Sequence, residues 1–86
     1  MVERFLYNMY YTYVLKSRKD SNLYVGCTND LKDRIKRHQT GLVDSTKSRR
    51  PFELVYYEAC LSEDKAFNRE RYFKSGFGRR FLKDRI

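Results

Sequence analysis

A guanidinium and an imidazole are spaced so that one helix would carry them side by side. Arg34 follows Leu31 by three residues and His38 follows Arg34 by four, which places both at the border of an apolar helix stripe. Arginine can bind phosphate oxygens and stabilise charge that develops on them, and histidine, with an ordinary pKa of about 6.5, can accept a proton at neutral pH. The pair therefore indicates phosphate chemistry, unless each residue is an ordinary surface or packing side chain.

A carboxylate interrupts the apolar pattern in the second half of the chain. Glu70 follows Ala66 by four residues and precedes Phe73 by three and Phe77 by seven, which predicts that it is embedded in the hydrophobic face of a helix. Burial of a carboxylate is costly unless a cation or a metal ion compensates. Two interpretations stay open: an internal salt bridge to an arginine, or a ligand for a divalent cation.

Two tyrosines and a glycine lie in strand-like segments that precede these residues. Tyr13 lies in the segment 10–15, and Tyr24 and Gly26 lie in the segment 23–27. A buried phenol needs a hydrogen-bond partner, so the tyrosines belong either to the same polar cluster or to an ordinary aromatic core. A glycine inside a strand pattern predicts that another group approaches the backbone closely.

The surrounding sequence predicts the elements that would position these side chains. Strand-like and helical segments follow one another. The expected strands are 10–15, 23–27 and 52–61, and the expected helices are 29–41, 62–75 and 79–85. We expect Thr28 or Asn29 to cap the first helix, Ser62 to cap the second, and Gly76 and Gly78 to break it. The order predicts an α+β fold, a small three-stranded antiparallel or mixed sheet flanked by helices, with the first strand central.

The charge of the chain predicts a polyanionic partner. The 86 residues suffice for one domain and carry a net charge of +8. Residues 29–50 contain seven basic and three acidic side chains, and residues 69–86 contain seven and two. Such clustering favours nucleic acid over an anionic membrane or an uninvolved basic surface. The candidate contacts to nucleic acid are Gly26, Lys32, Lys36, Arg37, Lys47, Arg49, Arg50, Arg69, Arg71, Arg79 and Arg80.

Composition argues against several other classes. Two cysteines and one histidine cannot build a four-ligand zinc site, and they do not suggest a disulfide scaffold, so we expect a reduced, cytoplasmic setting. No apolar run approaches the roughly 20 residues of a membrane span, and residues 1–8 have no signal-peptide core. We therefore expect no membrane partner.

Taken in order, these residues resemble the GIY-YIG nuclease superfamily, and within it the small stand-alone bacterial proteins similar to the N-terminal nuclease domain of the UvrC excinuclease. The first family motif falls on Tyr11-Thr12-Tyr13 and the second on Tyr24-Val25-Gly26, with 11 residues from Tyr13 to Tyr24. Arg34, His38 and Glu70 take the later family positions. The resemblance covers residues 9–85 and leaves residues 1–8 as an N-terminal extension of unassigned role.

The resemblance implies metal-dependent hydrolysis of a phosphodiester. Glu70 would hold one Mg²⁺ or Mn²⁺ and Arg34 would contact the scissile phosphate. Tyr24 would orient water or phosphate. Tyr13 and His38 are both candidates for the general base, and the sequence does not decide between them.

The resemblance also has departures that keep other functions open. The first motif lacks its Gly and Ile, and no asparagine follows Asn68 to fill a role common in catalytic members. The first hypothesis is a non-sequence-specific or structure-selective DNA endonuclease, with DNA preferred over RNA and a targeting protein as a further partner. The second is a catalytically impaired nucleic-acid-binding module, and the third is an RNA- or ribosome-associated basic protein.

Overall fold

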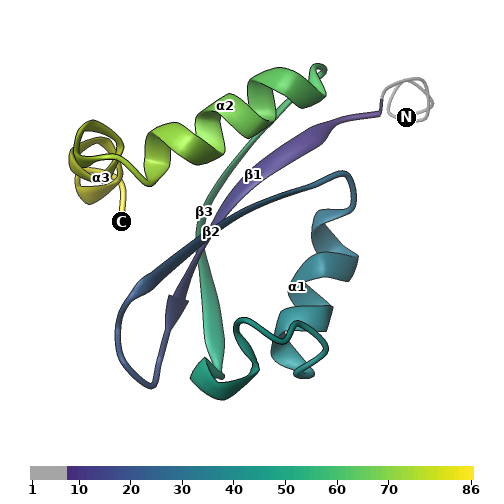
Figure 1. The fold of residues 1–86 in the computed structure, drawn as a ribbon, viewed down its shortest axis with the longest axis vertical. Coiled ribbons are helices and arrows are strands. Elements are labelled where there is room, and N and C mark those ends of the chain that lie inside the picture. The colour runs from purple at the N-terminus through teal and green to yellow at the C-terminus, as the bar shows by residue number, and fades with distance from the viewer. Residues whose placement is uncertain (1–7) are drawn as a thin grey trace.

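Three antiparallel strands form the centre of the fold (Figure 1). The computed structural model describes residues 8–86, and its strands are β1 (Tyr10–Ser17), β2 (Leu23–Thr28) and β3 (Phe52–Cys60). Their order across the sheet is β2-β1-β3, so the strand with two apolar faces is the central one, as predicted. Of the predicted N-terminal extension, all but Asn8 lies outside the described residues.

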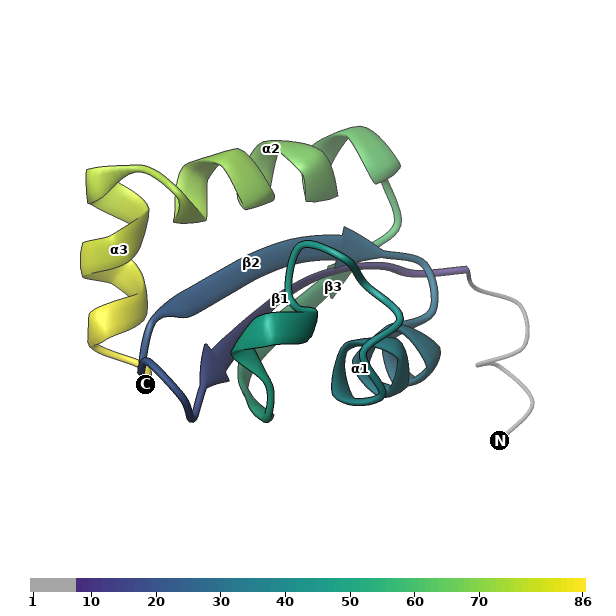
Figure 2. The same cartoon turned by 60° about the horizontal axis from the view of Figure 1, so that its bottom comes forward.

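Helices cover both faces of this sheet. Figure 2 shows α1 (Leu31–Gln39) on one face, and α2 (Glu63–Phe73) with α3 (Gly76–Lys83) on the other. A turn of 3-10 helix, η2 (Lys47–Arg49), lies in the loop between α1 and β3. The predicted α+β class and the order β-β-α-β-α-α are confirmed. Within residues 8–86, no helix is long and apolar enough to span a membrane.

One face of the central strand contributes to a core beneath α2 and α3. Val14 packs there with Val25 of β2, Phe73 of α2 and Leu82 of α3, all buried. Each large apolar side chain buried in this way stabilises the fold by about 1.5–3 kcal/mol. This core holds α2 against the sheet.

The opposite face of β1 contributes to a second core beneath α1. Tyr13 and Leu15 are fully buried there with Phe52, and Leu31 and Ile35 of α1 pack against them. The Tyr13 phenol therefore lies in the layer between the sheet and α1, the helix that carries Arg34 and His38.

β3 departs from regular strand pairing at Val55. Val14 pairs with Tyr56 and Leu15 pairs with Leu54, so Val55 is an extra residue in β3. Both Val55 and Tyr56 pack against the core beneath α2 and α3. The β-bulge thus lets two consecutive side chains cover the same core.

A buried hydrogen bond joins α2 to the central strand. Thr12 Oγ1 donates to the backbone oxygen of Ala66 over 2.9 Å, and both residues are buried. A carbonyl oxygen has two lone pairs, so Ala66 can accept this bond in addition to its helical one. The contact sets where α2 lies along β1, and with it the position of Glu70 one turn later.

The first two helices begin with side-chain caps. Thr28 still belongs to β2, so α1 is capped by Asp30, whose carboxylate accepts the Asp33 N–H over 3.1 Å. The prediction of Thr28 or Asn29 as the cap was therefore wrong by one residue or two. Ser62 caps α2 as predicted.

α3 begins at Gly76, three residues before its predicted start. Ser75 caps it by accepting the Gly78 N–H over 3.2 Å. A Cβ at Gly78 would overlap the carbonyl of Tyr72, so this glycine allows α3 to pack closely against the end of α2. Gly76 and Gly78 were expected to break the second helix. The break lies just before them, because α2 ends at Phe73 and both glycines belong to α3.

Candidate active site

Tyr13, His38 and Thr46 form a continuous line of buried hydrogen bonds. Tyr13 Oη lies 2.8 Å from His38 Nε2, and His38 Nδ1 lies 2.8 Å from Thr46 Oγ1. All three residues have an exposed fraction of 0%. Thr46 Oγ1 in turn donates to the backbone oxygen of Val43 over 3.4 Å. The line runs from β1 through α1 to the loop that precedes β3.

Gly26 of β2 makes room for the Tyr13 phenol. The two residues are paired in the β1–β2 ladder, and a Cβ at Gly26 would overlap the hydroxyl and ring of Tyr13. The sequence predicted that a group approaches the backbone here, and that group is the phenol. Gly26 is buried, so it acts on the site through Tyr13 and presents no surface to a nucleic acid.

Tyr24 and Arg34 flank the buried line. The ring centroid of Tyr24 lies 5.0 Å from that of His38 and 6.4 Å from that of Tyr13. Arg34 precedes His38 by one helical turn, and its charge acts on both Tyr13 and His38. Tyr24 and Arg34 are half-buried, so they reach solvent where Tyr13 and His38 do not.

Burial sets the protonation of the Tyr13–His38 pair. Loss of hydration, with a smaller contribution from Tyr24, raises the pKa of Tyr13 to about 12, although the Arg34 guanidinium acts in the opposite direction. Burial, and then the charge of Arg34, lowers the pKa of His38 below its ordinary value. At neutral pH the phenol therefore keeps its proton and the imidazole is uncharged.

Glu70 lies at the edge of the apolar stripe of α2, not inside it as predicted. The buried residues of α2 are Ala66 and Phe73, and the Glu70 side chain retains 21% of its exposure. The prediction counted Phe77 in the same stripe. Phe77 belongs to α3 and is exposed, so the spacing across the helix break carries no information about Glu70.

The Glu70 carboxylate has a local partner. It pairs with Lys74 Nζ over 2.9 Å, one turn further along α2. Its negative charge is also a minor contribution, after burial, to the raised pKa of Tyr13 and of the Cys27 thiol. Arg34 and Glu70 thus act on Tyr13 from α1 and α2, on opposite faces of the sheet.

A cavity of about 210 Å³ opens beside Arg34 where β2 ends. The end of β2, α1 and the first turns of α2 contribute its walls, with Tyr10, Cys27, Thr28, Asn29, Arg34, Glu63 and Phe67 as the lining residues. Phe67 is 44% exposed. A ligand in this cavity can contact the Arg34 guanidinium and the surface of α2 at once.

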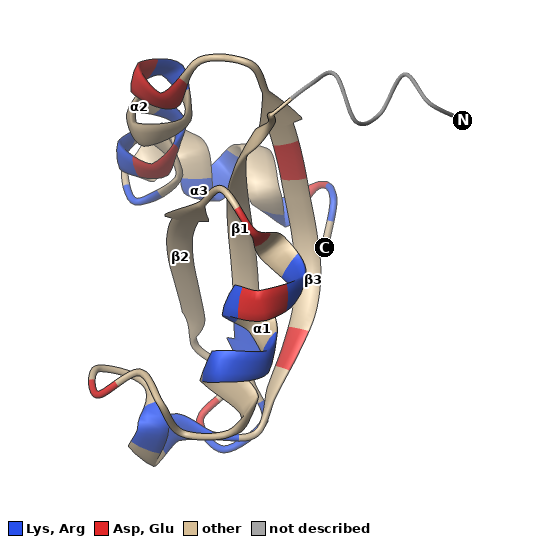
Figure 3. Ribbon diagram, turned by 90° about the vertical axis from the view of Figure 1, so that its right-hand side faces the viewer, with Lys and Arg blue, Asp and Glu red and all other residues tan. Residues whose placement is uncertain are grey.

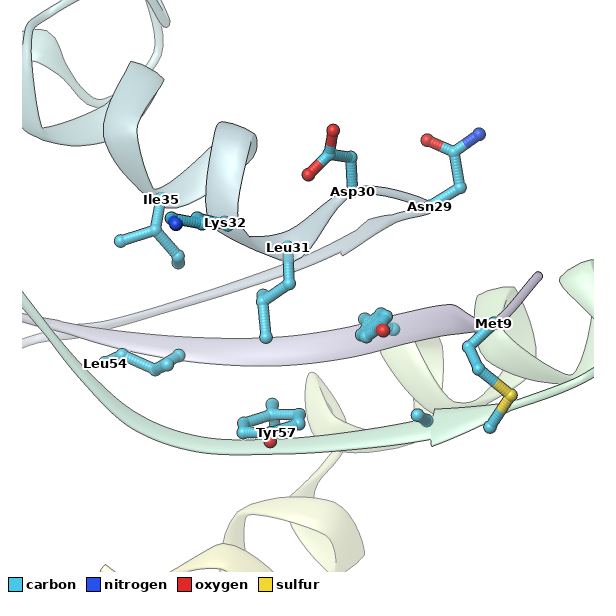
Figure 4. Close-up of a pocket in the computed structure, with 10 residues that line it drawn as sticks. Met9, Asn29, Asp30, Leu31, Lys32, Ile35, Leu54 and Tyr57 are labelled. Atoms are coloured by element: carbon cyan, nitrogen blue, oxygen red, sulfur yellow. The ribbon is translucent and has the colours of Figure 1, made fainter. Parts of the chain in front are cut away.

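A larger groove lies away from the cluster. It encloses about 740 Å³ between the start of α1 and strands β1 and β3, and Figure 4 shows Leu31, Ile35, Leu54 and Tyr57 among its apolar side chains. None of the five predicted catalytic residues lines it. Of these five residues, Arg34 alone lines the smaller cavity.

Several predicted nucleic-acid contacts are held by neighbouring side chains. Figure 3 shows basic residues on α1 and in the loop before β3, interspersed with acidic ones on α1. Within the described residues, ion pairs join Arg37 to Asp33, Lys47 to Asp44, Arg49 to Asp20 and Arg69 to Glu58, at 2.8, 3.5, 3.1 and 2.6 Å. Arg50 donates to the backbone oxygen of Lys47, Arg71 donates to Asn68, and Arg80 stacks on Phe77. Lys32, Lys36 and Arg79 are exposed and form no ion pair with a described residue.

Arg69 is the most firmly held of these cations. Its Nε and Nη2 atoms donate to the two oxygens of Glu58 over 2.6 and 3.1 Å. The guanidinium carbon also lies 4.8, 4.6 and 5.1 Å from the ring centroids of Tyr72, Phe73 and Phe81. Arg69 is therefore engaged in holding α2 to β3 and α3.

Thr46 is the member of the cluster that the sequence did not indicate. It lies in a polar, basic loop, and a threonine in such a segment has no pattern that distinguishes it from its neighbours. The structure brings it to His38 because the loop folds back against α1: both the Gln39 amide oxygen and amide nitrogen bond the backbone of Phe52, over 3.0 and 2.5 Å.

The carboxylate of Glu70 is chemically suited to bind an ion such as Mg²⁺. No cluster of three or more His, Cys, Asp or Glu side chains with metal-ligand geometry occurs within residues 8–86. Mg²⁺ is commonly held by only one or two carboxylates, with water and phosphate oxygens in its other positions, whereas zinc requires three or four protein ligands. Because Glu70 is partly exposed and its ion pair with Lys74 lies at the surface, it can exchange that partner for an ion.

Comparison with known proteins gives a consistent result. The family model of the GIY-YIG catalytic domain matches residues 9–83. A UPF0213 protein of Clostridium perfringens is 45% identical over 67 residues, covering 77% of this chain and 71% of that protein. UPF0213 protein YazA of Bacillus subtilis is 43% identical over 68 residues, covering 78% of this chain and 68% of that protein.

A solved structure agrees with this assignment. The solution NMR structure of a UPF0213 protein from Bacillus halodurans is similar with a TM-score of 0.56 at 33% identity, covering 88% of this chain and 83% of that one. The chain therefore belongs to the GIY-YIG nuclease family and is a relative of its small stand-alone UPF0213 proteins.

Proposed function

We propose that this protein is a metal-dependent DNA endonuclease that is either non-sequence-specific or structure-selective, with a role in DNA repair or recombination in the cytoplasm. The observation that carries the proposal is the hydrogen bond between the Tyr13 phenol and the neutral His38 imidazole beside Arg34. A structural core needs no such arrangement, because a buried phenol is satisfied by any carbonyl. A proton acceptor next to a guanidinium suits hydrolysis of a phosphodiester.

Tyr13 and His38 act together as the general base in this proposal. The phenol is protonated at neutral pH, so it can take a proton from water only if it passes its own proton to another group. His38 Nε2, 2.8 Å away and uncharged, is that acceptor. Since both are covered, the half-buried Tyr24 and Arg34 are the members of the cluster that meet water and substrate first.

Arg34 stabilises the charge that grows on the phosphate. Its guanidinium lines the cavity of about 210 Å³ at the end of β2. A cation placed where charge develops lowers the barrier because the interaction strengthens in the transition state. After burial, the charge of Arg34 beside it also helps to lower the pKa of His38.

Nucleases of this family generally use a divalent metal, and in this proposal Glu70 would hold one such ion, Mg²⁺ or Mn²⁺. When bound, the ion supplies a Lewis acid for a phosphate oxygen. The exposed Lys32, Lys36 and Arg79 contact the DNA backbone. Contacts of this kind depend on salt and carry no sequence information.

A second candidate function is a nucleic-acid-binding module without activity. The complete burial of Tyr13 and the absence of an asparagine after Asn68 favour it. A nicking assay on plasmid and branched DNA with Mg²⁺ or Mn²⁺ separates the two functions. Cleavage by the wild-type protein supports the endonuclease, and binding without cleavage of any substrate contradicts it.

A matched pair of variants tests the role of Glu70. Glu70→Gln removes the charge that would hold the ion and should abolish cleavage while DNA binding, followed by fluorescence anisotropy, is kept. Glu53→Gln is the control, because Glu53 is an exposed β3 carboxylate paired with Arg18 at 3.6 Å, and it should cleave like wild type. Equal activity of the two variants would contradict the assignment of the ion to Glu70.

A further inference from the structure

The loop before β3 contributes one fully buried polar side chain to the interior, that of Thr46. Its hydroxyl oxygen lies 2.8 Å from His38 Nδ1, on the opposite side of the ring from Tyr13. We propose that Thr46 is the positioning residue that holds His38 in the tautomer with its proton on Nδ1, so that Nε2 is free to accept the Tyr13 proton. The catalytic importance of this tautomer rests on the proposed endonuclease, in which Tyr13 and His38 act as the general base.

The direction of the hydrogen bonds follows from counting protons. The Tyr13 phenol is neutral at physiological pH, and its partner is His38 Nε2, so the phenol donates and Nε2 accepts. A neutral imidazole has one N–H, which must then be on Nδ1. Thr46 Oγ1 accepts that N–H and donates its own proton to the Val43 carbonyl over 3.4 Å, which can only accept.

Thr46 is held in place independently of His38. Its backbone N–H donates to the oxygen of Val43 over 3.0 Å. Three residues later, the backbone oxygen of Arg49 accepts from Ser17 Oγ over 2.7 Å, which ties the loop to the end of β1. A hydroxyl fixed by its own backbone can orient the imidazole, rather than follow it.

A hydroxyl suits this position better than a carboxylate. An aspartate or glutamate bonded to Nδ1 would raise the pKa of His38 and favour a charged ring that cannot accept a proton. Threonine sets the tautomer without adding charge. When the Tyr13 Oη–H bond breaks and the Nε2–H bond forms, His38 becomes an imidazolium whose Nδ1–H still donates to Thr46, so no further rearrangement is needed.

The titratable and charged groups near His38 lie on several elements. Tyr13 lies on β1, Tyr24 on β2 and Arg34 on α1. The charge of Glu70, on α2, affects the pKa of Tyr13 and not directly that of His38. None of these groups bonds Nδ1, whose partner is Thr46.

The test uses the fact that His38 is the single histidine of the chain. Long-range ¹H–¹⁵N correlation spectra of the full chain show directly which ring nitrogen carries the proton. We expect Nδ1–H in the wild type and in Thr46→Ser, and a loss of this preference in Thr46→Val, which keeps the shape and removes the hydroxyl. A wild-type ring with its proton on Nε2 overturns the proposal, whether or not the valine variant folds, and so does an unchanged Nδ1–H tautomer in Thr46→Val.

Cleavage supplies the second arm. Thr46→Val should cleave about 10- to 100-fold more slowly, by analogy with groups that orient metal-binding histidines, and Thr46→Ser should recover most of the rate. Wild-type cleavage by Thr46→Val contradicts the positioning role. If the wild-type protein cleaves no DNA, the endonuclease proposal fails, and the tautomer spectra still decide whether Thr46 orients His38.

Discussion

Gly26 allows a direct test of how tightly the Tyr13 phenol is held. In Gly26→Ala the new methyl group would overlap the hydroxyl and ring of Tyr13, which has no exposed surface and cannot move without leaving His38. Overpacking of a core costs about 1–3 kcal/mol. Loss of the 2.8 Å hydrogen bond adds about 1 kcal/mol.

The expected loss of about 2–4 kcal/mol in the free energy of unfolding is large for a chain of this size. The melting temperature of domains of this length falls by about 4–8 °C for each kcal/mol of lost stability, so that of Gly26→Ala should fall by at least about 8 °C. Thermal unfolding followed by circular dichroism measures it.

Gly76→Ala is the matched control for this measurement. Gly76 is the first residue of α3, and nothing lies within 4 Å of the position that its Cβ would take. The melting temperature of Gly76→Ala should equal that of the wild type or exceed it, because alanine stabilises a helix by about 0.5–1 kcal/mol relative to glycine. The reasoning is refuted if Gly26→Ala melts like the wild type, or if both variants lose the same amount.

Two further predictions concern charge. Arg34→Ala should slow cleavage by about 10²–10³-fold in the nicking assay, since a contact made in the transition state is lost. Its melting temperature should change little, because Arg34 is half-buried. An unfolded Arg34→Ala variant would instead support a structural role for this residue. The free energy of unfolding of the wild type, relative to Tyr13→Phe, should fall as the pH rises from about 10 to about 12, because the unfolded phenol releases its proton near the lower value and the folded one near the upper. Denaturant titrations across this range measure the difference, and a constant difference would contradict the raised pKa of Tyr13.

The architecture could be predicted because several local signals agree with one another. The segment at β1 is apolar on both faces, which only a central strand requires, and the structure places it in the middle of the sheet. Ser62 caps a helix and Gly41 ends one with a left-handed φ of 80°, as their chemistry predicts. Such signals act over a few residues, so no tertiary contact is needed to read them.

The site was only partly predictable, because two of its features depend on tertiary contacts. Thr46 reaches His38 only after the loop folds back on α1, and no periodicity encodes that path. Glu70 was placed too deep because Phe77 was counted on the same helix, whereas α2 ends at Phe73 and the chain turns into α3.

The ion pair between Glu70 and Lys74 has a consequence for how ligands would load. Lys74 is a resident counter-ion, and a metal ion can use the same carboxylate fully only after the ammonium group, 2.9 Å away, has left it. A DNA phosphate drawn to Lys74 would release Glu70, and a metal on Glu70 would release Lys74 for phosphate. Each ligand would thereby ease the entry of the other, and thermodynamic linkage requires the two enhancements to be equal.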